Sequence, residues 1–258
     1  MRPLLTLVFL LVTRGAVSAA EPLIEQSFES HLSRAVGYRY LLHVPAGAEA
    51  DPDRRWPVLL FLHGAGERGD DLWRVAIHGP PKLLRGTGPL TEAETAAARV
   101  LAENFIVVAP QCPAGASWDD EAVLALLDAV QAKQKVDPAR VYLTGLSMGG
   151  YGTWSLASRY PERFAAVVPI CGGGQTISLL LATNEKKAAL RTLGFRVFHG
   201  ARDPTVPVNE SERLVALLKR GGVTDLELTI YPEARHDSWT ETYANAELYT
   251  WLLRHERR

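Results

Sequence analysis

The feature that most constrains the fold is the stretch from Val141 to Gly152, which reads VYLTGLSMGGYG. A short apolar run enters a Gly-x-Ser-x-Gly turn, and a helix-compatible run from Tyr151 to Tyr160 follows it. Between a strand and a helix, such a turn holds the hydroxyl of Ser147 clear of the backbone as a nucleophile. We expect glycine at 145 and 149 because a Cβ on either side of this tight turn would collide with neighbouring backbone. The motif is weak evidence by itself, and its strand and helix are what favour a catalytic serine.

The chain is long and apolar enough to fold around this turn as one domain. Its 258 residues are 47% hydrophobic, which favours a single large α/β domain over two small ones. Apolar runs alternate with helical patterns, so we predict a mainly parallel sheet covered on both faces. The predicted strands are 24–30, 38–44, 56–62, 105–109, 140–143, 164–170, 195–199 and 226–231. The first two are expected to form a half-exposed antiparallel pair.

Helices are predicted between these strands from capping patterns and periodicity. Residues 72–103 form an insertion whose second half, from Thr91, has high helix propensity and the capping pattern TEAE. This insertion either forms one wall of a substrate cleft or is a surface excursion without a role. The other predicted helices are 119–135, 151–160, about 177–190, 207–220 and a single C-terminal helix at 239–255.

The first twenty residues have the layout of a secretory signal. Arg2 precedes an almost wholly apolar run of nine residues, and small residues close the segment at Ala19 and Ala20. Nine helical residues span about 14 Å, well short of the ~30 Å hydrocarbon core, so a stable membrane anchor is disfavoured. We therefore predict a signal peptide at 1–20, a catalytic domain at 21–258, and a secreted or periplasmic protein.

Charge and motif patterns exclude several other classes of protein. Lys and Arg together number 28 against 29 for Asp and Glu, a balance that argues against nucleic-acid or anionic-membrane partners. No His-Glu-x-x-His or paired-cysteine spacing is present, which disfavours a metal hydrolase. No dinucleotide fingerprint follows the first buried strand, so no cofactor is predicted. Nothing in the sequence specifies an oligomeric state.

A serine nucleophile needs a base, and the base needs an acid that orients it. In hydrolases that carry the serine on such a strand-to-helix turn, the chain order is serine, acid, histidine, each on a loop that follows a strand. His236 is the predicted base, and Asp203 is the predicted acid. Asp237 is the rival acid, and it ranks lower because sequence neighbours rarely turn their side chains toward each other. His63 is predicted to brace the loop that completes an oxyanion hole.

Five motifs in this order resemble the α/β-hydrolase superfamily. They are LHGAGERG at 62–69, PQCP at 110–113, GLSMGG at 145–150, HGARD at 199–203 and HDSW at 236–239. The chain is most similar to exported esterases and predicted peptidases related to dienelactone hydrolase, feruloyl esterase and polyhydroxybutyrate depolymerase. This resemblance extends from about the second strand to the C-terminus, and it implies an α/β-hydrolase fold with a sheet of the eight-stranded type.

The resemblance also implies roles for individual residues. Ser147 is the implied nucleophile, His236 the general base and then acid, and Asp203 the residue that orients it. Backbone N–H groups of Met148 and Ala65 are implied to form the oxyanion hole. The expected substrate is a small-molecule or polymer-linked ester that is cleaved through an acyl-enzyme.

The resemblance bears on the cysteines and the aromatic residues as well. The family's sheet order places the strands before Cys112 and Cys171 three positions apart, about 14 Å, against a limit of ~7 Å between the Cα atoms of a disulfide. Two free thiols are therefore expected. Trp118, Tyr151 and Trp239 adjoin motif residues and are candidate walls of a substrate pocket, although such aromatic side chains more often belong to the core.

Two other functions remain open beside ester hydrolysis. The motifs do not separate ester from amide cleavage, so a serine peptidase of the same fold is an alternative. The chain lacks room for the large gating domain of prolyl-oligopeptidase-type enzymes, which favours esters. A catalytically silent binding module is the other alternative, because a fold does not fix a function.

Overall fold

The computed structural model describes residues 35–46, 48, 53–86 and 88–257. The chain divides into two units, Met1–Ala35 and Val36–Arg258, and the elements below belong to the second. The predicted signal peptide and the predicted strand 24–30, with its antiparallel pairing, lie outside the described residues. In the part that the structure describes, no helix combines the length and the apolar character that crossing a bilayer requires.

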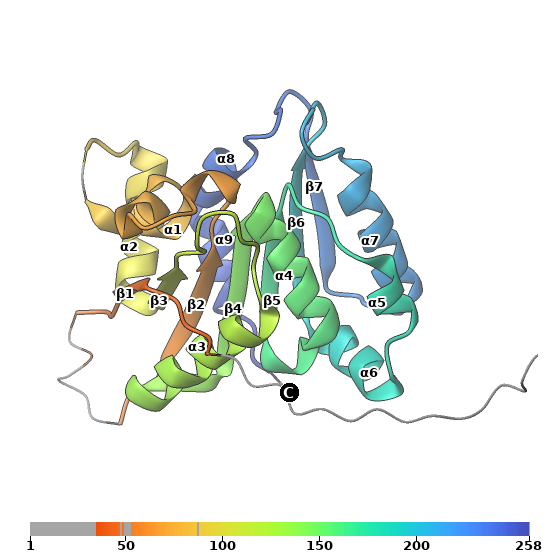
Figure 1. Ribbon diagram of the computed structural model, residues 1–258, viewed down its shortest axis with the longest axis horizontal. Coiled ribbons are helices and arrows are strands. Elements are labelled where there is room, and N and C mark those ends of the chain that lie inside the picture. Colours follow the sequence, from red (N-terminus) through yellow and green to blue (C-terminus); the bar gives the residue numbers. More distant parts are fainter. Residues whose placement is uncertain (1–34, 47, 49–52, 87, 258) are drawn as a thin grey trace, which may run out of the picture. The chain divides into compact units, whose positions relative to one another are not determined.

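Seven strands of the described chain form one sheet in the order β1-β3-β2-β4-β5-β6-β7 (Figure 1). They are β1 (Tyr40–His43), β2 (Trp56–Leu62), β3 (Ile106–Pro110), β4 (Val136–Leu146), β5 (Ala166–Ile170), β6 (Gly194–Gly200) and β7 (Leu226–Tyr231). β1 runs antiparallel to β3, and every other neighbouring pair is parallel. The predicted mainly parallel sheet is confirmed. β4 starts earlier than expected because Val136 pairs with Trp56 ahead of a register shift.

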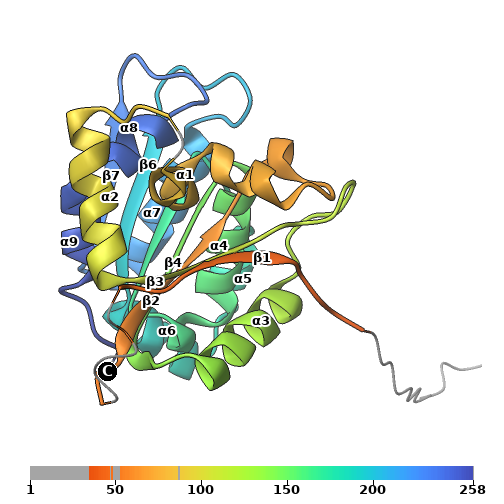
Figure 2. The same cartoon turned by 90° about the vertical axis from the view of Figure 1, so that its left-hand side faces the viewer.

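Helices cover both faces of the sheet (Figure 2). One hydrophobic core lies under α3 (Asp120–Lys133), α4 (Met148–Arg159), α5 (Thr176–Leu180), α6 (Asn184–Thr192) and α7 (Asn209–Arg220). The other lies under α1 (Gly79–Arg85), α2 (Glu92–Asn104), α8 (Trp239–Ala244) and α9 (Ala246–Leu252). Short 3₁₀ helices are η1 (Ala65–Glu67), η2 (Leu72–Ile77) and η3 (Pro161–Arg163).

The apolar run of β2 explains how the two cores share one sheet. Val58, Leu60 and Leu62 face the first core, whereas Leu59 and Phe61 face the second. Successive side chains of a strand point to opposite faces, so a strand covered on both sides needs apolar residues at every position. Each fully buried side chain of this size stabilises the fold by about 1.5–3 kcal/mol relative to leaving it exposed.

The insertion before β3 is helical, and its second helix begins at the predicted capping box. The hydroxyl of Thr91 accepts the N–H of Glu94, and the Glu94 carboxylate accepts the N–H of Thr91. Lys82 Nζ donates to the same carboxylate at 2.7 Å. The predicted helix from Thr91 is therefore confirmed, and an ion pair joins it to α1.

Two predicted helices, about 177–190 and 239–255, were wrong in extent, because the structure has two shorter helices in place of each. Residues 181–183 separate α5 from α6, and Asn245 separates α8 from α9. Asn245 has an extended backbone, with φ −88° and ψ 110°, and its side chain accepts the N–H of Glu247 at 2.9 Å. The asparagine therefore starts a new helix, because an N-cap side chain satisfies a first-turn N–H that would otherwise lack a partner.

Candidate active site

Ser147 lies on the turn between β4 and α4 with an unusual backbone, φ 52° and ψ −116°. A positive φ is strained for a residue with a Cβ, and the turn is held by the Ser147 N–H, which donates to the Ile170 carbonyl at 3.0 Å. A Cβ on Gly149 would lie 1.9 Å from the carbonyl oxygen of Leu62, and one on Gly145 would lie 2.3 Å from that of Gly149. The steric reason predicted for both glycines is confirmed.

Asp203 lies in the loop after β6 with its side chain fully buried. Its Oδ1 accepts the N–H groups of Thr205 and Val206 at 2.8 and 2.9 Å. Burial raises the pKa of this carboxyl, but hydrogen bonds from His236 and from those two backbone N–H groups outweigh burial and hold the pKa below its ordinary value. Asp203 is therefore an ionised acceptor at neutral pH.

His199, near the end of β6, supports the loop that carries Asp203. Its Nε2 donates to the Val206 carbonyl at 2.9 Å, and its Nδ1 accepts the hydroxyl of Ser211 on α7 at 2.8 Å. The same Nε2 lies 3.4 Å from Asp203 Oδ2. Sequence reasoning quoted His199 within a motif and assigned it no role.

His236 lies in the loop between β7 and α8, and that loop touches the end of β6. A Cβ on Gly200 would lie 2.0 Å from the carbonyl oxygen of Arg235. The Arg202 N–H donates to the Ala234 carbonyl at 3.0 Å. This close backbone approach, which glycine alone permits, brings the histidine against the acid loop.

Serine, histidine and aspartate form one hydrogen-bonded chain. His236 Nδ1 lies 2.7 Å from Asp203 Oδ2, and His236 Nε2 lies 2.9 Å from Ser147 Oγ. An ionised carboxylate only accepts, so Nδ1 carries the proton and Nε2 is left to accept the serine hydroxyl. The rival acid turns away, since the Asp237 carboxylate accepts the N–H and the hydroxyl of Thr240 at 3.0 and 2.9 Å.

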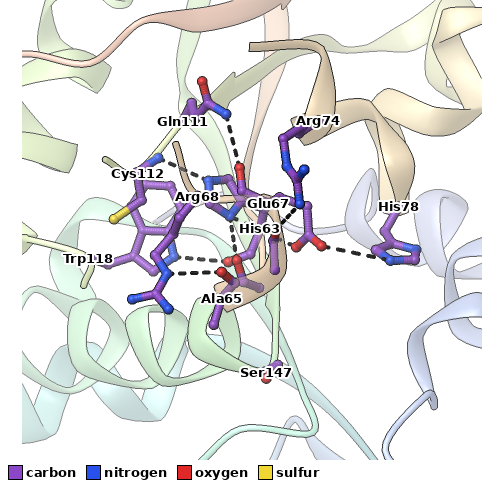
Figure 3. A network of polar contacts seen from close by, with 12 residues as sticks. His63, Ala65, Glu67, Arg68, Arg74, His78, Gln111, Cys112, Trp118 and Ser147 are labelled. Atoms are coloured by element: carbon purple, nitrogen blue, oxygen red, sulfur yellow. Dashed lines mark hydrogen bonds and ion pairs between the residues drawn. The ribbon is translucent and has the colours of Figure 1, made fainter. Parts of the chain in front are cut away.

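His63 braces the loop after β2, as predicted (Figure 3). Its ring is fully buried. Nε2 accepts the N–H of Cys112 at 2.9 Å, so Nδ1 carries the proton and donates to the Gly64 carbonyl at 2.6 Å. Burial lowers the pKa of His63 to about 4, although the hydrogen bond to Gly64 opposes this shift. The ring is therefore neutral at neutral pH and holds one tautomer.

The segment after β3 clamps the same loop from the side. Gln111 Nε2 donates to the carbonyls of Glu67 and Asp71 at 3.0 and 2.6 Å. The indole N–H of Trp118 donates to the His63 carbonyl at 3.1 Å. Figure 3 shows these side chains meeting the loop above Ser147. The sequence singled out the PQCP motif without a role for Gln111, and the structure supplies one.

Two backbone N–H groups stand at the starts of helices, one in the loop after β2 and one directly after Ser147. Ala65 is the first residue of η1, and Met148 is the first residue of α4. N–H groups in the first turn of a helix have no acceptor within that helix. Such N–H donors stabilise a developing oxyanion best when the surrounding hydrogen bonds hold them in position before the reaction.

A buried carboxylate stands behind this loop. Glu67 Oε1 lies 3.9 Å from His78 Nε2, and Oε2 lies 4.0 Å from His63 Nδ1. Oε2 has no hydrogen-bond partner among the described residues. The His78 ring packs edge-on against Trp239, which packs edge-on against His236, with centroids 5.4 Å apart in both pairs. His78, for which the sequence showed no partner, thus lies in the wall of the site.

The three candidate pocket aromatics divide between two places. Trp118 and Tyr151 line a cleft of about 510 Å³ that begins beside Met148. Tyr151 is 41% exposed, so it does not belong to the core. Trp239 lies outside this cleft, against the ring of His236.

The two cysteines do not pair with each other. Cys112 and Cys171 are buried and unpaired, and β3 and β5 lie three positions apart in the sheet. The expectation of two free thiols is confirmed. Across the described ranges, no cluster of three or more His, Cys, Asp or Glu side chains is arranged to hold a metal ion.

The sheet order and the placement of these residues define an α/β hydrolase. Residues 94–247 match the model of the Dienelactone hydrolase family, a range that includes Ser147, Asp203 and His236. The chain belongs to the dienelactone hydrolase family, and the resemblance found in the sequence is confirmed.

Relatives and solved structures agree with this fold. A thermostable esterase of known structure is 33% identical with a TM-score of 0.68, over 84% of this chain and 59% of its own. Poly(3-hydroxyalkanoate) depolymerase C of Paucimonas lemoignei is 28% identical over 51% of this chain and 30% of its own. A bifunctional acetylxylan esterase/xylanase of Neocallimastix patriciarum is 30% identical over 51% and 18%. The chain thus spans less than two thirds of the length of these relatives.

Proposed function

We propose that this protein is a serine hydrolase that cleaves carboxylic esters through an acyl-enzyme. The supporting observation is the hydrogen-bonded chain in which His236 lies 2.7 Å from Asp203 and 2.9 Å from Ser147. Esterases recur among the proteins that this chain resembles, which favours an ester over an amide. The serine peptidase and the silent binding module have no comparable observation in their favour.

The chemistry follows from the protonation states. His236 Nε2 takes the proton of Ser147 as the hydroxyl attacks the acyl carbonyl, and Asp203 stabilises the imidazolium that forms. The N–H groups of Ala65 and Met148 donate to the negative oxygen of the tetrahedral intermediate, at about 3–4 kcal/mol per donor. Nε2 then gives its proton to the leaving alcohol. Water activated by the same nitrogen releases the acid and restores the serine.

The test is the loss of esterase activity in a Ser147→Ala variant. We expect kcat on p-nitrophenyl acetate to fall by at least about 10⁴-fold, because the nucleophile is gone while binding remains. Thr192→Ala, which removes an exposed hydroxyl at the end of α6, is the matched control and keeps full activity. Wild-type turnover of peptide anilides but of no ester would assign a peptidase instead. Full activity in Ser147→Ala would refute the mechanism.

We also propose that residues 1–20 are a signal peptide that is removed on export. The support is the basic residue, apolar run and small residues of this segment. N-terminal sequencing of the protein recovered from the periplasm or the medium should begin at position 20 or 21. Recovery of the intact Met1 terminus from the cytoplasm would refute export.

A further inference from the structure

A cleft of about 510 Å³ extends along α4, well beyond the reacting atoms. Met148, Tyr151, Ser155 and Arg159 line it, and their spacing of three and four residues places them on one face of the helix. At 1.5 Å per residue, the helix carries this face about 16 Å from the nucleophile. We name this cleft the α4 groove.

Two segments from different strands form its walls. Ser117 and Trp118 come from the segment after β3, and Gln175 and Ser178 come from the segment after β5. Figure 1 shows α4 between these two segments. One end of the groove opens beside Met148, the residue after the nucleophile. A chain that lies in the groove would therefore have one end at the reacting centre.

The charges along the groove are paired. Arg159 is the one charged residue among those that line it, and its guanidinium donates to Asp120 at 2.7 Å. Ser155 donates to the same buried carboxylate at 2.8 Å. Arg213 donates to the carbonyl of Gly174, which lines the groove, and forms an ion pair with Glu210. The groove thus presents no net charge that would select an anion or a cation.

The lining is rich in hydrogen-bonding groups that carry no charge. Four serine hydroxyls and one amide line it, from Ser117, Ser155, Ser158, Ser178 and Gln175. Partial burial, and then the charge of Glu210, raise the pKa of Tyr151, so its phenol stays protonated and can donate. Arg159 has further N–H groups beyond the one that binds Asp120.

The apolar part of the lining is aromatic. Trp118 and Tyr151 lie near the end of the groove beside the nucleophile. Met148 is the one apolar side chain of the lining that is not aromatic. Sugar rings combine apolar C–H faces, which pack on aromatic rings, with hydroxyls that both donate and accept hydrogen bonds. A hydrocarbon-rich polyester would desolvate the serine hydroxyls without replacing all their hydrogen bonds, at a cost in binding.

We propose that the α4 groove binds an uncharged oligosaccharide chain to which the scissile ester is attached. This inference rests on the proposed ester hydrolysis at Ser147 and adds the class of substrate. The ring next to the ester lies against Trp118 and Tyr151, and the rings beyond it lie along Ser155 toward Arg159.

The first experiment compares acetylated xylohexaose with acetylated xylose. We expect wild-type kcat/KM to be at least about tenfold higher for the hexaose, because each additional hydrogen bond to the groove is worth about threefold to tenfold. Ser178→Trp fills the groove and Arg159→Met removes its far donor, and both lower this ratio toward one. Arg254→Met, which breaks an exposed ion pair with Glu247 on α9, is the matched control and leaves the ratio unchanged.

A binding measurement separates the groove from the chemistry. Calorimetric titration of Ser147→Ala protein with unesterified xylohexaose should show binding that the added Ser178→Trp substitution weakens about tenfold. Equal kcat/KM on both sugar esters would overturn the inference while turnover of p-nitrophenyl acetate leaves the proposed function standing. A preference for oligomers of 3-hydroxybutyrate that Ser178→Trp abolishes would also overturn it, in favour of a polyester chain.

Discussion

Replacing Asp203 by asparagine tests how the site sets the tautomer of its histidine. Oδ1 of Asp203 accepts two backbone N–H groups, from Thr205 and Val206. An asparagine must keep its oxygen there, because turning its NH₂ toward two donors would leave both unpaired at about 1–3 kcal/mol each. The NH₂ group then faces His236 Nδ1, which must accept. The proton moves to Nε2, and the histidine can no longer take a proton from Ser147.

The expected loss in kcat is about 10⁴-fold, or about 5.5 kcal/mol in the activation free energy. The assay is hydrolysis of p-nitrophenyl acetate, with thermal unfolding measured in parallel to show that the variant is folded. Asp237→Asn is the matched control, since this exposed carboxylate accepts the N–H and the hydroxyl of Thr240, whereas Asp203 accepts His236. We expect its kcat to stay within about twofold of wild type, as for most exposed substitutions. If Asp203→Asn keeps more than a tenth of the activity, or Asp237→Asn shows the large loss, the reasoning fails.

Three further outcomes follow from the contacts described. The pKa of His63 is about 4 in the folded state against 6.5 ordinarily, so the unfolded chain binds more protons between these values, and stability falls as the pH drops. Urea unfolding at pH 7 and 4.5 measures how much of the free energy of unfolding is lost as the pH drops. We expect this loss to be about 2 kcal/mol smaller in His63→Gln than in wild type, and equal losses would refute this. Gly200→Ala, whose Cβ meets backbone at 2.0 Å, should lower both activity and melting temperature, whereas Gly37→Ala, with open space, should change neither. Burial raises the pKa of Cys112, and that of Cys171 to about 12, so a thiol reagent should label neither in the native protein and both after denaturation.

The parts of the site that the sequence predicted are those set by local rules. Glycines at 145 and 149 follow from steric contacts within a tight turn, and the mainly parallel sheet follows from alternating apolar and helical runs. Asp203 and His236 were predicted as acid and base because each follows a strand and because they fit the chain order serine, acid, histidine of α/β hydrolases. The structure places the two side chains 2.7 Å apart.

The parts that the sequence missed depend on contacts between distant segments or on competition at helix ends. Gln111 binds carbonyls that lie 40 and 44 positions away, and no periodicity encodes such a contact. His199 supports the acid loop through a carbonyl, which any residue carries and no motif reveals. The helix over 239–255 was predicted as one because its apolar spacing continues, but Asn245 caps a new helix locally.

The indole of Trp118 limits which mutations can reshape the α4 groove. The same side chain lines the α4 groove and donates to the carbonyl of His63, so a mutation that reshapes the groove at this point also loosens the loop after β2. Variant libraries that randomise Trp118 for new specificity should therefore yield mostly slow enzymes. Libraries directed at Gln175 or Ser178, on the opposite wall, alter the groove without that coupling and offer the more productive route to new substrates.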